Sequence, residues 1–149
     1  MRYETEYRSP IGPLTLVASD DALVELRFGA STASHQTPLL AQLGAELHEY
    51  FAGTRQRFDV PLAPEGTAFQ RQVWRALAEI PHGQTRSYAE IAARIGRPTA
   101  TRAVGAANGQ NPIAILIPCH RVLGSNGALR GYRWGLHQKE ALLARERLA

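Results

Sequence analysis

The spacing of apolar residues predicts a chain in two parts, the first rich in strands and the second in helices. In residues 3–7, tyrosines and a threonine alternate with charged residues, which is the period of a half-buried strand. Residues 14–18 and 24–28 predict two more strands, and the short connections favour antiparallel pairing. Leucines and aromatic residues across 39–51 then recur at helical spacing, and Gly53 offers a C-terminal stop.

The end of the first part is less regular. Apolar residues alternate across 58–62 and predict a short strand at a sheet edge, because Pro61 cannot donate to a central ladder. Residues 61–66 then form a connector rich in proline and glycine. We expect an N-terminal sheet-and-helix subdomain over residues 1–62 and a second subdomain over residues 67–149.

Capping patterns mark the helices of the second part. Thr67–Gln70 and Ser87–Glu90 are capping boxes. They predict one helix ending near residue 80 and another ending at Gly96. Thr99 is expected to cap a third helix over about residues 100–108. Two short helices joined by a glycine-containing turn resemble a helix-turn-helix, for which an ordinary helical hairpin is the alternative.

The third helix favours the DNA-binding interpretation. Its residues are nearly all small, so it could approach a nucleic-acid backbone closely, and Arg102 projects from it. Downstream, the turn at residues 124–127 lies between short extended pieces and predicts a small wing. A last helix is expected over about residues 136–147. The fold class is therefore α/β, of the α+β type.

Composition limits the class of protein. The single cysteine among 149 residues excludes an internal disulfide and a cysteine-rich zinc site, and it fits a reducing cytosol. The longest apolar run, residues 113–117, is far shorter than the ~18 residues of a membrane helix. The first residues show no signal peptide. We expect a cytoplasmic monomer without a membrane segment, a metal or a cofactor.

Charge divides unevenly along the chain. Residues 1–66 carry five arginines against nine acidic residues, whereas residues 67–149 carry twelve basic residues against four acidic ones. The first part is therefore at −4 and the second at +8, which together give the net charge of +4. A basic second half favours a polyanionic partner, although basic composition alone is not specific.

The candidate nucleophile is Cys119, which follows an apolar run and Pro118 and precedes His120 and Arg121. A lone cysteine is more often a buried structural residue. Adjacent positive charge lowers a thiol pKa from about 8.5, and a pKa of ~6 would need about 3.4 kcal/mol of differential stabilisation. We predict that the two cationic neighbours contribute to such a shift.

His120 is expected not to touch Cys119, because consecutive side chains point in different directions on a strand or a helix. A water or another group would relay the proton to the imidazole. A carboxylate is expected behind the imidazole to orient it.

At this point the sequence resembles a known family. Residues 117–122, Ile-Pro-Cys-His-Arg-Val, resemble the active-site signature of the O6-alkylguanine-DNA alkyltransferases, which are suicide DNA-repair proteins. Arg102-Ala-Val-Gly upstream, Asn111-Pro and Gly131-Tyr132 strengthen the resemblance. It covers the whole chain in layout and residues 67–149 in detail. It implies an N-terminal subdomain resembling ribonuclease H, followed by a helical subdomain with a helix-turn-helix.

The resemblance also implies a reaction and its residues. The cysteine of this family takes the alkyl group from O6 of a flipped guanine permanently, in double-stranded DNA and without a cofactor; O4-alkylthymine is an expected second substrate. Cys119 matches the nucleophile, His120 the base acting through a water, Glu146 the carboxylate behind it, and Asn111 the residue holding the active-site turn. The expected substrate pocket comprises Tyr88, Ala114, Val122, Tyr132 and Trp134, and the expected DNA contacts are Tyr88, Arg97, Arg102, Ala103, Gly105 and Ser125.

Two departures from the family pattern concern the pocket. Trp134 stands where many relatives have a small residue, and Ala114 stands where others carry a proline that can stack on a flat substituent. Stacking of this kind contributes roughly 0.5–1.5 kcal/mol. We therefore expect methyl lesions to react well and O6-benzylguanine poorly.

Three other classes of function compete with alkyl transfer. A Cys-His hydrolase would turn over and would need an oxyanion site. A non-catalytic lesion binder resembles the family but lacks the cysteine. A regulatory helix-turn-helix protein would need sequence specificity and usually a dimer.

Overall fold

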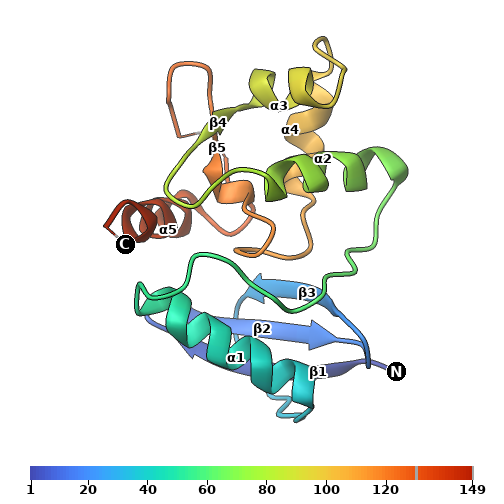
Figure 1. The fold of residues 1–149 in the computed structure, drawn as a ribbon, viewed down its shortest axis with the longest axis vertical. Helices are drawn as coiled ribbons and strands as arrows, with labels where there is room; N and C mark the ends of the chain where they lie inside the picture. Colours follow the sequence, from blue (N-terminus) through green and yellow to red (C-terminus); the bar gives the residue numbers. More distant parts are fainter. Residues whose placement is uncertain (130, 149) are drawn as a thin grey trace.

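The computed structural model describes residues 1–129 and 131–148, and it begins with a three-stranded sheet (Figure 1). Strands β1 (Tyr3–Ser9), β2 (Gly12–Ala18) and β3 (Leu23–Phe28) pair antiparallel in the order β1-β2-β3. Tight turns set the register, which pairs Ser9 with Gly12 at one end. The three predicted strands and their antiparallel pairing are confirmed.

Helix α1 (Pro38–Phe51) lies against this sheet. The Thr37 hydroxyl accepts from the backbone N–H of Leu40, which satisfies one unpaired donor of the first turn. The helix buries Leu43 and Leu47 completely, together with Tyr50 near its C-terminal end. The sheet and this helix form the lower layer of the molecule in Figure 1.

Strand β3 connects the N-terminal part to the rest of the chain. Leu23 exchanges backbone hydrogen bonds with Pro61 and Ala63 on the connector, in a single parallel bridge centred on Leu62. The edge strand predicted over 58–62 is therefore wrong in extent, because only one bridge forms. A second bridge pairs Leu26 with Ile113, just upstream of the cysteine.

Three helices follow the connector: α2 (Ala68–Ala78), α3 (Tyr88–Arg94) and α4 (Thr101–Gly109). Both predicted capping boxes are present, at Thr67 and at Ser87. Thr99 is not the cap of α4, and that prediction is wrong. A turn from Arg97 to Ala100 places Ala100 at the N-cap instead, with no side-chain bond.

The last elements surround the cysteine. Strand β5 (Val122–Leu123) pairs in parallel with β4 (Arg86–Ser87), directly before α3. The predicted wing is a loop that a backbone bond from Gly124 N to Ala128 O closes. Helix α5 (Leu136–Leu148) ends the described chain. Over residues 1–129 and 131–148, no helix has both the length and the apolar character that crossing a membrane requires.

One core joins the two parts. Trp74 on α2 is buried, and its indole N–H donates to Ala107 O on α4 at 2.8 Å. The apolar run before the cysteine lies in the same core as the leucines of β2, β3 and α1. Residues 113–117 therefore lie between the sheet layer and the helical layer, and this position brings the cysteine next to both.

Candidate active site

The segment from Asn111 to Cys119 is held by one buried amide. Asn111 Oδ1 accepts from Ile113 N at 3.0 Å, while its Nδ2 lies 2.8 Å from Ile117 O and 3.1 Å from Cys119 Sγ. These contacts join the start, middle and end of the segment. The residue that the family pattern assigns to holding the turn therefore contacts both the turn and the thiol.

Two tight turns shape the same segment. Leu116 N donates to Ala114 O at 2.8 Å around Ile115, whose φ is +71°. A γ-turn with positive φ is rare, and a β-branched residue in it is strained by about 1–3 kcal/mol. A second γ-turn centres on Pro118, where Cys119 N donates to Ile117 O at 2.8 Å. The turns deliver Cys119 to the start of the short 3₁₀ helix Cys119–Arg121.

Cys119 is buried, with 2% of the residue's surface exposed. Burial raises its pKa to about 11, although the bond from Asn111, the charge of Lys139 and the nearby Tyr132 hydroxyl each lower it. The expected shift toward an acidic thiol is therefore wrong: in this structure the loss of hydration outweighs nearby positive charge. The resting residue is a thiol, and a thiolate at pH 7 costs about 5 kcal/mol.

The cationic neighbours are not aimed at the sulfur. Arg121 donates from Nε and Nη2 to the carboxylate of Glu146, at 2.8 and 3.0 Å, and from Nη1 to Ile80 O at 2.7 Å. The charge that does act on the thiol belongs to Lys139, the single lysine of the chain. Its buried Nζ donates to Val122 O at 2.6 Å.

His120 is fully buried and paired with Glu146, with Nε2 2.7 Å from Oε2. Burial lowers the pKa of His120, against the opposing effect of Glu146, so the imidazole is neutral. Burial alone would raise the pKa of Glu146, but His120 and Arg121 hold it well below its usual range. An ionised carboxylate only accepts, so Nε2 carries the hydrogen and Nδ1 carries the lone pair.

That lone pair is the free base of the site. His120 Nδ1 is buried and has no hydrogen-bond partner within residues 1–129 and 131–148. No hydrogen bond joins it to Cys119 among these residues, as predicted from the adjacency of the two side chains.

Tyr50 completes the group around Glu146, and the sequence pattern did not reveal it. Its hydroxyl donates to Glu146 Oε2 at 2.6 Å across 96 positions of sequence. Burial, followed by the charge of Glu146, holds the pKa of Tyr50 well above its usual value. The phenol is therefore a permanent donor.

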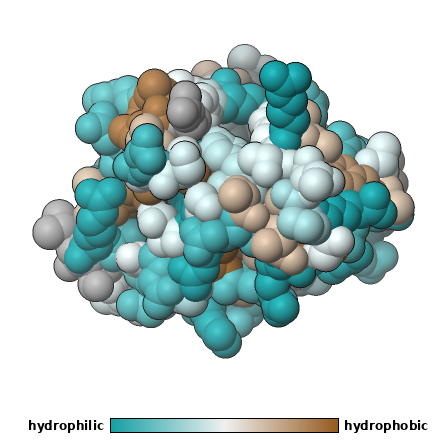
Figure 2. Space-filling model, turned by 90° about the horizontal axis from the view of Figure 1, so that it is seen from above, coloured by the Kyte–Doolittle hydropathy of each residue, from teal (hydrophilic) through white to brown (hydrophobic). Residues whose placement is uncertain are grey.

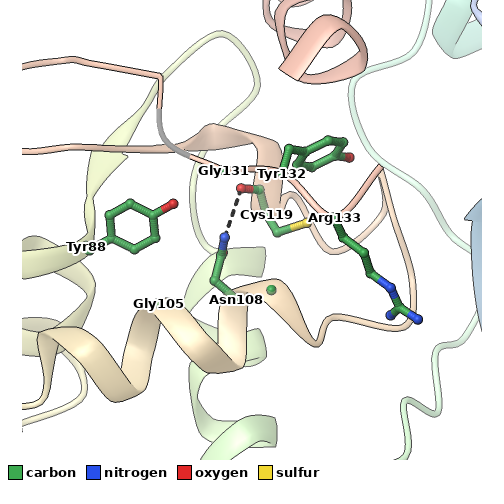
Figure 3. A pocket seen from close by; sticks show the side chains of 8 residues that line it. Tyr88, Gly105, Asn108, Cys119, Gly131, Tyr132 and Arg133 are labelled. Carbon is green, nitrogen blue, oxygen red and sulfur yellow. Dashed lines mark hydrogen bonds between the residues drawn. The ribbon is translucent and has the colours of Figure 1, made fainter. Parts of the chain in front are cut away.

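Cys119 lines a cavity of about 280 Å³, which is small for a ligand pocket. Figure 3 shows Tyr88 on one side with its hydroxyl directed toward the interior, and Cys119 with Tyr132 on the other. The Tyr132 hydroxyl is buried without a hydrogen bond of normal geometry among the described residues. The remaining lining residues are Gly105, Asn108, Gly109, Gly131 and Arg133.

Asn108 and Gly109 were not predicted as site residues. Their spacing from Gly105 places all three on one face of α4, and this was the available signal. Asn108 Nδ2 lies 3.5 Å from Cys119 O, as the dashed line in Figure 3 shows. Arg133 follows directly after the predicted Tyr132.

Three predicted pocket residues do not line this cavity. Ala114 is fully buried, and its N–H donates to Leu26 O on β3 at 2.9 Å. Val122 is fully buried and belongs to β5. Trp134 packs on Phe28, with ring centroids 5.7 Å apart, and on Tyr132 at 5.3 Å. Trp134 therefore lies behind a wall of the cavity and contacts it through Tyr132.

The outer face of α4 presents small side chains beside this cavity. Arg102 and Ala103 are exposed, and Gly105 is half-buried against the Tyr88 ring. Across the described chain, the side chain of Arg102 makes no hydrogen bond or ion pair. Viewed from the helical layer, the surface is mainly hydrophilic or of intermediate hydropathy (Figure 2).

The remaining predicted DNA contacts lie on loops. Arg97 follows α3, and its guanidinium lies 5.7 Å from the centroid of the Phe69 ring. Ser125 is exposed in the turn after β5. No group of three or more His, Cys, Asp or Glu side chains gathers as a metal site within the described ranges.

Comparison with known proteins identifies the family. The DNA-binding domain of 6-O-methylguanine DNA methyltransferase matches residues 68–148, and the ribonuclease-like domain of that family matches residues 1–64. The chain belongs to the 6-O-methylguanine DNA methyltransferase family. The predicted family and the predicted fold class, with a ribonuclease-like N-terminal part, are confirmed.

Individual members of the methyltransferase family are similar along nearly their whole length. The methylated-DNA–protein-cysteine methyltransferase of Methanosarcina acetivorans is 48% identical over 152 residues, which cover 97% of each chain. The O6-methylguanine methyltransferase of Mycobacterium tuberculosis superposes with a TM-score of 0.91 at 46% identity, over 99% of this chain and 94% of that one. A structure of the M. tuberculosis protein in complex with DNA gives a TM-score of 0.89 at 47% identity, covering 99% and 92%.

Proposed function

We propose that this protein repairs DNA directly by transferring the alkyl group of O6-alkylguanine to Cys119, once per molecule. The observation that supports this most strongly is a buried thiol that lines a small cavity, with a neutral imidazole and an ionised carboxylate behind it. The similarity to methylated-DNA–protein-cysteine methyltransferases along nearly the whole chain supports the same reaction.

The first chemical step creates the nucleophile. The proton of Cys119 passes through a water to Nδ1 of His120, and Glu146 stabilises the imidazolium that forms. The bond from Asn111 and the charge of Lys139 stabilise the negative sulfur. A thiol with a pKa of about 11 needs such a base close by.

The transfer itself is a substitution at carbon. The thiolate forms a bond to the alkyl carbon as the bond from that carbon to O6 breaks, and the electron pair passes to the guanine. The guanine then takes a proton, for which the Tyr88 hydroxyl at the opposite side of the cavity is the proposed donor. The His120 imidazolium then releases the thiol proton to solvent, and the Tyr88 tyrosinate takes a proton back from solvent. In sum the thiol proton is exchanged for the alkyl group, so no other reactant is consumed. A thioether has no leaving path, and the residue reacts once.

The depth of the thiol imposes a condition on the DNA. The sulfur of a residue that is only 2% exposed cannot reach a base inside the duplex, so the guanine must rotate out of the stack. The small outer residues of α4 allow close approach through the minor groove, and exposed Arg102 can fill the gap left by the base. Arg97, Ala103, Gly105 and Ser125 are proposed contacts of the same face.

O4-alkylthymine is a second proposed substrate, because its alkylated oxygen occupies a similar edge of the base. We also propose that the protein acts as a cytoplasmic monomer. Nothing in the mechanism requires a second subunit.

The test uses a duplex carrying one O6-methylguanine. Digestion of the DNA after mixing should show guanine in place of O6-methylguanine, in an amount that does not exceed the protein. Cys119→Ser should bind the duplex but leave the lesion intact. Repair of many lesions per protein, with release of the methyl group to solvent, would instead indicate a hydrolase.

A further inference from the structure

Tyr50 belongs to the N-terminal subdomain yet contacts the group behind the active-site histidine. We propose that Tyr50 is a positioning residue for alkyl transfer, which fixes the carboxylate of Glu146 and limits how strongly that carboxylate attracts the proton on His120. The inference rests on the proposed function, because it concerns the base of that reaction.

The geometry is specific to one oxygen atom. The Tyr50 hydroxyl lies 2.6 Å from Glu146 Oε2, and His120 Nε2 lies 2.7 Å from the same oxygen. Tyr50 is 4% exposed and Glu146 is 2% exposed, so water does not replace either donor readily. Three protein donors therefore share Oε2: the Tyr50 hydroxyl, His120 Nε2 and, at 3.0 Å, Arg121 Nη2.

The Tyr50 ring is held from several sides. Phe51 and Phe58 lie against it, with ring centroids 5.1 and 5.5 Å away, and His82 lies edge-on at 6.0 Å. Arg145 on α5 also donates to Phe51 O at 3.2 Å. The C-terminal end of α1 is thereby attached to the helix that carries the carboxylate, and Figure 1 shows α5 beside this end of α1.

The shared oxygen couples Tyr50 to the base. A hydroxyl that donates to Oε2 neutralises part of its charge, so the carboxylate attracts the imidazolium proton less strongly. Removing the hydroxyl leaves the charge of Oε2 to His120 and Arg121, so its attraction for the imidazolium proton increases. The imidazolium then becomes more stable, and the neutral form needed to accept the thiol proton is populated only at higher pH.

Other charged and titratable groups face this cluster and stay unchanged in the test. Arg121 binds both oxygens of Glu146, and Lys139 lowers the pKa of His120 from α5. His82 and Arg145 act on the same cluster from the loop after α2 and from α5. Cys119 and Tyr132 lie on the cavity side.

The experiment compares Tyr50→Phe with Tyr7→Phe, in single-turnover transfer from methylated duplex between pH 5 and 9. Tyr7 is a half-buried tyrosine on β1, so its variant controls for loss of a hydroxyl elsewhere. Tyr50→Phe should move the acid limb of the pH–rate profile to a pH about one unit higher. At a pH below the limb, transfer by this variant should be about tenfold slower than transfer by the unmodified protein. Tyr7→Phe should leave the limb in place.

A second probe keeps both the hydroxyl and the fold. Fluorinated tyrosine at position 50 has a more acidic phenol and is a stronger donor, so it should move the limb downward. The inference would be overturned if the acid limb of the pH–rate profile stayed in place in both Tyr50 variants, or if the rate fell equally at every pH. The proposed function would still stand in that case, provided that the unmodified protein transfers the methyl group. Absence of transfer to Cys119 in the unmodified protein would overturn the proposed function itself.

Discussion

Replacing Glu146 by glutamine should destabilise the protein strongly. The carboxylate accepts hydrogen bonds from Tyr50, from His120 and twice from Arg121. Glutamine has a single acceptor oxygen, and its amide N–H groups would face donors. The guanidinium of Arg121, with an 8% exposed side chain, would lose its counter-charge. Breaking a buried pair in this way costs about 3–5 kcal/mol.

A loss of this size is a large fraction of the roughly 5–15 kcal/mol that stabilises a domain. Urea unfolding at pH 7 should therefore place Glu146→Gln about 3–5 kcal/mol below the unmodified protein. Glu140→Gln is the matched control, because Glu140 lies on the same helix and is exposed. Its free energy of unfolding should change by less than about 0.5 kcal/mol.

The pH dependence identifies the cause. The pKa of Glu146 is depressed in the folded state, so its contribution to stability is present above the unfolded pKa near 4.5 and is lost as the pH falls toward the folded value. Between pH 4.5 and pH 3, the difference in free energy of unfolding between Glu146→Gln and the unmodified protein should shrink by about 2 kcal/mol. A cost below about 1 kcal/mol at pH 7, or a cost that does not change down to pH 3, would refute the reasoning.

Four further predictions concern the DNA contacts, the packing on β3 and the cavity. Arg102→Ala should slow transfer from duplex more than from single-stranded DNA, and equal losses on both would make Arg102 an ordinary phosphate contact. Arg97→Ala should weaken binding to all sequences alike and lower the salt slope by about one, as measured by titration at several salt concentrations. Ala114→Pro removes the backbone N–H that donates to β3, and it should lower the free energy of unfolding in urea by about 1–3 kcal/mol. Trp134→Ala removes the ring that packs on Tyr132, so Tyr132 can move and the cavity can widen. The rate of reaction with O6-benzylguanine should then rise more than the rate with O6-methylguanine.

Local patterns predicted much of the fold. The alternation in residues 3–7, the helical leucines of α1 and the capping boxes at Thr67 and Ser87 all act between neighbours in sequence, so the sequence displays them directly. Thr99 is not the N-cap, because the turn from Arg97 to Ala100 makes α4 begin one residue later than predicted. Such a shift by one residue depends on the whole turn, which propensity does not resolve.

The site was predictable where the family pattern is contiguous and less so where distant segments meet. Asn111 bonds to the turn and to the thiol, and His120 bonds to Glu146, whereas the roles that the resemblance implies for these residues stay predictions. The pKa of Cys119 could not be predicted from its neighbours, because burial by the surrounding core dominates it. The role of Tyr50 could not be predicted for a related reason, because its hydroxyl meets the carboxylate of Glu146, 96 positions away, only when α1 and α5 come together in the fold.

In the proposed reaction, Cys119 keeps the alkyl group. Intact-mass analysis of the protein after mixing with excess duplex containing O6-methylguanine tests it most directly, followed by peptide mapping of the modified residue. We expect the mass to rise by one methyl group, the stoichiometry to saturate at one and the methyl to map to Cys119. An unmodified protein alongside repaired DNA, or a methyl group on another residue, would contradict the account.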